Sequence, residues 1–289
     1  MQRGRALFVL VSLMAMSAWA QPPPFSHLRP AVGEVVLGDG LAKLTVPADF
    51  GYLTPEEVET VPMERWARPP GTRMLGMVIP LSRDTTSPMK RGFTLEYLPD
   101  GHVDDQDAAS LDPEVLLTRL RKHVQSESEE HIRMGRGAQA LLGWASPPRY
   151  DASTRTVSWG LEVAHEGVKL TQVHYHGRLL GKDGVLVLLG DSSMLSMPQG
   201  EEELRAVLAA IHFLPGHRYE DFKPGTDRVA RGGVGGLVAP KADGLKGLLE
   251  SLKGGTRLLY VGLACVVFLV VALGRHFMRP GRDGRSAAP

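Results

Sequence analysis

The chain has 289 residues, of which 43% are hydrophobic and 22% are charged. These proportions exclude a largely disordered protein, and the length allows one large domain or two small ones. The 33 basic and 32 acidic side chains give a net charge of +1. Because this balance produces no strong positive field, we expect no nucleic-acid partner. The single cysteine, Cys265, excludes an internal disulfide, so the hydrophobic core must hold the fold together.

The first twenty residues have the three parts of a secretory signal peptide. Arg3 and Arg5 precede an apolar run, and Ala18 and Ala20 supply the small residues that a signal peptidase needs. The apolar run is short for a bilayer span, which takes about 20 residues. We therefore predict a cleaved signal peptide at 1–20, although an uncleaved anchor or a buried helix is the alternative. A proline-rich, extended leader follows at 21–34.

The exported part, residues 35–240, begins with segments that read as strands. Residues 41–46 alternate in polarity and end at a proline, and two further apolar runs at 73–81 and 92–101 indicate strands as well. An acidic loop follows. Asp112 and Pro113 then predict a helix start, because the first offers a capping oxygen and the second has its φ already set. Val115, Leu116, Leu120 and Val124 continue at helical spacing.

From Arg155 the sequence predicts a meander of three strands, at 155–164, 168–180 and 185–190, joined by tight turns. The last strand is continuously apolar, which indicates burial on both faces. A helix from 198 follows, with Leu204, Val207, Leu208 and Ile211 as its buried stripe, and then a turn anchored by Tyr219 and Phe222. Strand pairs mixed with isolated helices favour an α+β fold, mostly antiparallel sheet with a few packed helices, over a doubly wound sheet.

The carboxy-terminal part predicts a membrane anchor. A glycine-rich segment at 231–244 marks the end of the domain, and the leucines of 241–256 suit an amphipathic helix on a membrane surface. Residues 258–274 carry no charge and cover about 25 Å as a helix. We therefore predict a transmembrane helix at 257–278 and a short basic cytoplasmic tail at 279–289. The signal peptide orients the main domain toward the periplasm.

Five sequence blocks carry a resemblance when they are taken together and in order: "RPPGTRMLGMVIP", "GHVDDQDAASLDPEVLL", "LLGWASPPRYDASTRTVSW", "GRLLGKDGVLVL" and "FLPGHRYEDFKPGTDRVA". The chain resembles a bacterial family of membrane-anchored proteins that share a domain of unknown function, DUF2167. The resemblance covers roughly 35–240 and the carboxy-terminal anchor. It implies an exported domain tethered to the inner membrane, and it supplies no catalytic residues.

Three histidines are candidate metal ligands. His174 and His176 lie two apart on a predicted strand, so they share one face, and His165 near the neighbouring turn could bring a third imidazole to zinc or copper. The alternative is a strand that faces solvent or a partner. Members of the resembling family usually have asparagines at the positions of His174 and His176, which argues against a family-wide metal site.

The acidic loop offers a second candidate cation site. Asp104, Asp105 and Asp107 supply hard oxygen atoms, but the glycine and the glutamate of a calcium loop are absent. A solvated loop ahead of a helix is the alternative. Among the aromatic residues, Trp159 is expected in the core, whereas Trp66 and Trp144 lie close to prolines and are candidates for lining a groove.

These observations favour a non-enzymatic module of the cell envelope that binds a membrane or periplasmic protein partner and needs no cofactor. Enzymatic activity stays open. The alternative is a metal-binding protein or an enzyme that uses the histidine strand or the Asp104–Asp107 loop. A sensor that signals through the transmembrane helix is a third reading, which the short tail weakens.

Overall fold

The computed structural model describes residues 28–60, 71–81, 92–133 and 137–239. The predicted signal peptide, the first half of the leader, the juxtamembrane segment, the transmembrane helix and the basic tail lie outside these residues. Within the part of the chain that is described, no helix is long and apolar enough to span a membrane.

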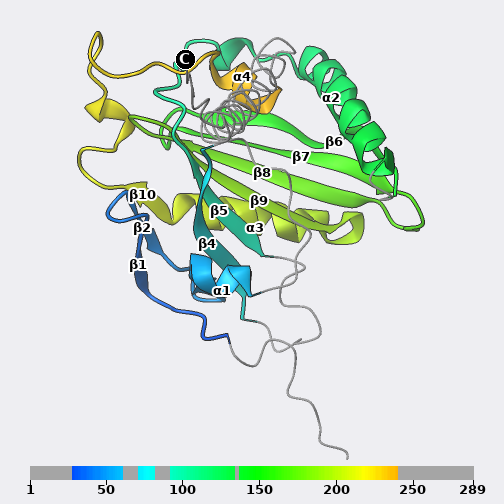
Figure 1. Ribbon diagram of the computed structural model, residues 1–289, viewed down its shortest axis with the longest axis horizontal. Helices are drawn as coiled ribbons and strands as arrows, with labels where there is room; N and C mark the ends of the chain where they lie inside the picture. The colour runs from blue at the N-terminus through cyan, green and yellow to red at the C-terminus, as the bar shows by residue number, and fades with distance from the viewer. Residues whose placement is uncertain (1–27, 61–70, 82–91, 134–136, 240–289) are drawn as a thin grey trace, which may run out of the picture.

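Ten strands of the described chain form two antiparallel sheets (Figure 1). The larger has seven strands in the order β3-β4-β5-β9-β8-β7-β6, and the smaller has the order β1-β2-β10. An α+β fold built mostly on antiparallel sheet is therefore confirmed. The strands are β1 (Glu34–Leu37), β2 (Ala42–Thr45), β3 (Phe50–Leu53), β4 (Arg73–Pro80), β5 (Phe93–Leu98), β6 (Gln139–Asp151), β7 (Thr156–His165), β8 (Gln172–Leu180), β9 (Val185–Ser193) and β10 (Ile211–Phe213).

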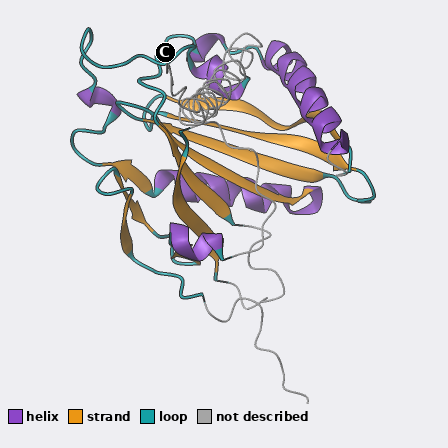
Figure 2. Cartoon of the chain, viewed as in Figure 1, coloured by secondary structure: helices purple, strands orange, loops and turns teal. Residues whose placement is uncertain are grey.

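Helices cover both faces of the seven-stranded sheet (Figure 2). On one face, α3 (Met197–Ala209) and the small sheet bury a core with β4, β5, β8 and β9. On the other face, α2 (Pro113–Arg133) and α4 (Val234–Val238) bury a second core, and α1 (Pro55–Glu59) packs beside β4. The sheet is thus the middle layer of a three-layer arrangement.

Strand β9 lies in the middle of the sheet, between β5 and β8, as its apolar sequence predicts. Val187 is buried in the core beneath α2 and Leu188 in the core beneath α3. Both faces of β9 are therefore covered, which explains why its sequence does not alternate.

The predicted start of α2 is confirmed. The Asp112 side chain accepts hydrogen bonds from the backbone N–H groups of Glu114 and Val115, at 3.0 and 3.2 Å. Leu116 and Leu120 are buried as expected. Val115 is 45% exposed, so it lies outside the buried face of the helix although it belongs to the apolar pattern of the sequence.

The second predicted helix ends earlier than its apolar stripe suggests. Helix α3 stops at Ala209, and Ile211 begins β10, where it pairs with Leu44 of β2. Ile211 is buried all the same, because the strand turns it into the same core. The glycine-rich segment was expected to mark the end of the domain, but part of it belongs to the fold. It contains α4, whose residues Val234 and Val238 are buried under the sheet.

Candidate functional site

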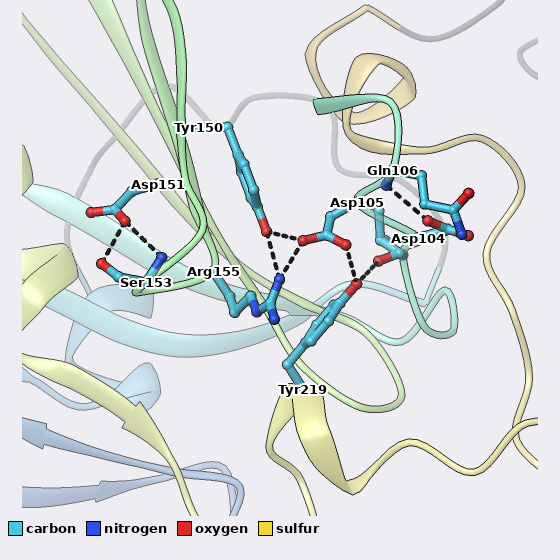
Figure 3. Close-up of polar contacts among 9 residues, drawn as sticks. Asp104, Asp105, Gln106, Tyr150, Asp151, Ser153, Arg155 and Tyr219 are labelled. Atoms are coloured by element: carbon cyan, nitrogen blue, oxygen red, sulfur yellow. Dashed lines mark hydrogen bonds and ion pairs between the residues drawn. The ribbon is translucent and has the colours of Figure 1, made fainter. Parts of the chain in front are cut away.

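Four segments that are distant in the sequence meet at one end of the sheet, around the carboxylate of Asp105 (Figure 3). Asp105 comes from the acidic loop before α2, and Tyr150 comes from the end of β6. Arg155 lies in the hairpin between β6 and β7, and Tyr219 opens a short 3-10 helix after β10. We call these four residues the Asp105 cluster.

All three partners of Asp105 donate to its carboxylate. The hydroxyl of Tyr150 lies 2.5 Å from Oδ2, and the hydroxyl of Tyr219 lies 3.1 Å from Oδ1. The guanidinium of Arg155 forms an ion pair with Oδ2. The Tyr219 hydroxyl also lies 3.1 Å from the backbone carbonyl oxygen of Val103. Both oxygens of the carboxylate therefore accept hydrogen bonds. Because the acceptor is charged, these hydrogen bonds are of the stronger, charge-assisted kind.

The backbone at Arg155 is held in the left-handed region, with a φ of 55°. This conformation is uncommon for a residue other than glycine and costs on the order of 1 kcal/mol. Its carbonyl accepts a hydrogen bond from the N–H of Leu180 at 2.9 Å, and its guanidinium stacks 4.6 Å from the centre of the Tyr219 ring. The Asp151 carboxylate accepts hydrogen bonds from Ser153 inside the same turn. These contacts fix the position of the Arg155 side chain.

The cluster is a fixed arrangement of charge. Burial acts to raise the pKa of Asp105, but hydrogen bonds from Tyr150 and Tyr219 and the nearby charge of Arg155 outweigh it, so that this pKa lies below its ordinary value. Burial, together with the hydrogen bond to Asp105, raises the pKa of Tyr150 to about 12. Burial and the charge of Asp105 raise the pKa of Tyr219 as well. None of these three groups gains or loses a proton near neutral pH. General acid–base catalysis requires a group that does.

A groove of about 400 Å³ runs beside the cluster. Arg155 and Tyr219 form part of one wall, and Arg218 adds a second guanidinium. The end of α3 and strand β10 also line the groove. The groove is lined by Ser153, Thr154, Arg155, Leu179, Leu180, Leu208, Ala209, Ile211, His212, Phe213, Arg218, Tyr219 and Glu220.

The carboxylates of the other two aspartates of the acidic loop also accept hydrogen bonds from backbone N–H groups. Asp104 accepts a hydrogen bond from the N–H of Gln106 at 2.8 Å (Figure 3). Asp107 accepts from the first N–H groups of α4, those of Val234 and Gly235, at 2.8 and 3.0 Å. The loop thus ties β6, β7 and α4 together, and its carboxylates do not converge on one point.

Two of the three candidate histidines come together. His165 Nε2 lies 3.4 Å from His174 Nε2, and the two ring centres are 5.5 Å apart. His176 instead stacks on Trp159, with ring centres 4.9 Å apart and planes 3° from parallel. Within the described ranges, no three histidine, cysteine or acidic side chains are grouped closely enough to hold a metal ion.

The strand that carries these histidines lies between β7 and β9 and does not face solvent, so the solvent-facing alternative is wrong. His174 is only 6% exposed, and burial, with a smaller contribution from the charge of His165, lowers its pKa to about 3. The pKa of His176 lies well below its ordinary value, because of its burial first and the charge of Arg178 second. Both imidazoles are neutral at physiological pH. Nδ1 of His176 has no hydrogen-bond partner.

The tryptophans divide between core and helix contacts. Trp159 is 2% exposed, as predicted for a core residue. Trp144 donates its indole N–H to the carbonyl of Pro113 at 3.1 Å and packs against the core beneath α2, so it does not line the groove. Trp66 lies outside the described residues.

The sequence singled out Asp105 and Tyr219 but not their association. Asp105 was a candidate cation ligand, Tyr219 was expected to anchor a turn, and neither Tyr150 nor Arg155 was selected. The anchoring role is confirmed, because Phe222 stacks on His102 at 3.8 Å and Tyr219 lies 4.3 Å from the same ring. A usable signal for the cluster was Arg155 itself, a charged residue that follows the mostly polar stretch 151–154 at the start of a predicted strand.

The chain belongs to the family described as "Protein of unknown function (DUF2167)", whose model matches residues 29–274. No curated protein matches the sequence. Among solved structures, the chain is similar to the solution structure of cyanobacterial PsbP (CyanoP) from Synechocystis sp. PCC 6803, with a TM-score of 0.38 and 8% identity. That similarity covers 65% of this chain and 96% of the other.

Proposed function

We propose that the protein is a membrane-anchored, periplasmic binding module whose groove beside the Asp105 cluster receives another protein of the cell envelope. The observation that carries this proposal is the groove itself. It has a volume of about 400 Å³, and Arg155, Arg218 and Tyr219 are among the residues that line it. Arginine and tyrosine are enriched in protein interfaces, where they supply large contact areas with polar ends.

The chemistry of the cluster supports binding rather than catalysis. A general acid or base needs a pKa near the working pH, whereas Asp105 has a lowered pKa and the two tyrosines have raised ones. A fixed arginine, by contrast, is useful for recognition, because it needs no reorganisation when a partner binds. The left-handed backbone at Arg155 places that side chain at the rim of the groove.

The location is supported by sequence features outside the described residues. A signal peptide at 1–20 would export the domain, and a transmembrane helix at 257–278, which contains the uncharged stretch 258–274, would hold it at the inner membrane. The family match extends to residue 274 and so includes most of that apolar segment.

The test is chemical crosslinking in intact cells with three forms of the tagged chain: full length, a version ending before Arg257, and full-length Arg218→Glu. We expect one stoichiometric partner that the shortened version retains and that Arg218→Glu loses. Arg119→Glu is the matched control, because Arg119 is an exposed arginine of α2, on the other face of the sheet. Equal recovery from both charge-reversed variants would exclude the groove as the binding surface.

A further inference from the structure

We propose that the apolar tip of the large sheet, which Val168, Leu170, Met194 and Leu195 form, contacts the surface of the lipid bilayer. Val168 and Leu170 belong to the turn between β7 and β8, whereas Met194 and Leu195 belong to the turn that follows β9. This role rests on the membrane anchor of the proposed function, because only an anchored domain is held against one bilayer. It does not depend on what the groove binds.

The two turns of the apolar tip lie side by side. Gln172, the first residue of β8, pairs with Ser193, the last residue of β9. The backbone N–H of Met194 donates to the carbonyl oxygen of Thr171 at 3.0 Å, so the pairing continues into the turns. Both turns extend from the end of the sheet that is opposite β10 (Figure 1). Their apolar side chains are therefore neighbours at one end of the domain.

The apolar side chains of the tip are open to solvent. Leu195 is 79% exposed and Leu170 is 54% exposed, and Val168 and Met194 are exposed beside them. Single exposed apolar residues are ordinary on a soluble domain, whereas a contiguous apolar patch marks a contact with a protein or a membrane. The tip is a patch of this second kind.

The size of the tip favours a bilayer over a protein partner. A stable protein interface takes about 20–30 residues from each side, on a surface of roughly 800 Å². The tip offers four apolar side chains on two narrow turns, which is far less. A bilayer requires no complementary shape, and apolar side chains gain from it in proportion to the area that they bury. The anchor also keeps the bilayer at a high effective concentration, so a weak contact is enough.

The charges near the tip indicate that the contact depends on apolar side chains. Glu166 and Lys169 are the exposed charged residues of the turn between β7 and β8, and their charges cancel. Glu202 is exposed further back, on α3. Anionic lipids attract clusters of basic residues, and the tip has no such cluster among the described residues. We therefore expect the tip to contact zwitterionic and anionic bilayers equally well.

The tip and the groove lie at opposite ends of β8. Leu179 and Leu180 at the end of this strand line the groove, whereas the tip adjoins its start. The nine residues of β8 cover about 30 Å. The described chain ends after α4, which is bound to Asp107 in the acidic loop at the groove end. Residues 240–256 lead to the predicted membrane helix and can extend to about 56–61 Å, which is enough to let the tip reach the bilayer.

The experiment places a fluorescent label on the full-length chain in nanodiscs of zwitterionic lipid. Cys265→Ser removes the native thiol, and Leu195→Cys or Leu170→Cys supplies the labelling position. The matched control is Val36→Cys, since Val36 is an apolar residue of β1 that is 61% exposed in the smaller sheet. With spin-labelled lipids as quenchers, we expect at least twofold stronger quenching at positions 195 and 170 than at position 36. Adding Leu170→Asp should halve the quenching at position 195, whereas adding Val36→Asp should not change it.

Equal quenching at positions 195 and 36 would overturn the proposal. A label at position 195 that is shielded from a water-soluble quencher but not reached by the lipid quencher would also overturn it, because the tip would then face a protein. Failure of the anchor is seen separately, since a chain without a membrane helix would not co-purify with the nanodiscs. None of these substitutions touches Arg155 or Arg218, so the partner-binding test of the groove is not affected.

Discussion

Replacing Asp105 by asparagine tests whether the Asp105 cluster holds the end of the sheet together. The substitution keeps the shape and one acceptor oxygen but removes the charge that pairs with Arg155 and strengthens the hydrogen bonds from Tyr150 and Tyr219. A hydrogen bond to a charged group contributes about 1.5–3 kcal/mol to stability when it is buried. The side chains of Asp105 and Arg155 are 22% and 41% exposed, so solvent screens part of this energy.

We therefore expect Asp105→Asn to lower the free energy of unfolding by about 2 kcal/mol. For a domain of this size the midpoint of thermal unfolding should fall by about 4–8 °C. The assay is thermal unfolding of the full chain followed by circular dichroism. The control is Asp104→Asn, because its carboxylate caps the N–H of Gln106 and asparagine retains that acceptor; its midpoint should change by less than about 2 °C.

The stabilisation that Asp105 contributes should change with pH in a defined direction. The pKa of Asp105 is lower in the folded chain than its ordinary value, so its stabilisation is present above about pH 4 and is lost as the pH falls through the folded pKa. The difference between wild type and Asp105→Asn should thus be constant near neutral pH and shrink in acid. An equal loss of stability in the two asparagine variants, or a difference that grows in acid, would show that the charge of Asp105 does not stabilise this end of the sheet.

Three further predictions follow from single contacts. Asp107→Ala removes the acceptor of the first two N–H groups of α4 and should cost about 1–2 kcal/mol in urea unfolding, whereas Asp107→Asn should cost less. Gly200→Ala in α3 would place a methyl group 2.4 Å from the hydroxyl of Tyr175 and should cost about 1–3 kcal/mol, while Gly143→Ala in β6, which meets no atom within 4 Å, should change stability by less than about 0.5 kcal/mol. A loss for Gly200→Ala no larger than that for Gly143→Ala would contradict the close contact between α3 and Tyr175. His174 is neutral in the folded chain, with a pKa of about 3, so the free energy of unfolding of the wild type should fall by up to about 1.4 kcal/mol per pH unit below about pH 6.5. In a series of melting curves at different pH values, the stability of His174→Gln should depend less steeply on pH.

The elements that were predicted correctly are those whose formation depends on residues close together in the sequence. The cap at Asp112 and the apolar stripe of α2 depend on residues within two turns of one another. The long apolar run of β9 depends on its own composition. Strand β6 was missed because Pro147 and Pro148 interrupt it, which is tolerated at the edge of a sheet, where backbone N–H groups need no partner.

The candidate site could not be predicted in the same way, because its contacts join distant parts of the chain. Asp105 meets Tyr150 across 45 positions and Tyr219 across 114. No local period encodes such a contact. The histidine pair shows the same limit, since strand alternation placed His174 and His176 together, whereas the structure turns His174 toward His165 and leaves His176 stacked on Trp159.

Site-specific photo-crosslinking can show whether the groove beside Arg155 receives a protein partner. A photoreactive amino acid would replace His212, which lines the groove, or Arg119, on the opposite side of the sheet, in the full-length chain in intact cells. We expect one discrete crosslinked species from position 212 that is lost when Arg218→Glu is added, and none from position 119. The same species from both positions, or from position 212 regardless of Arg218, would contradict it.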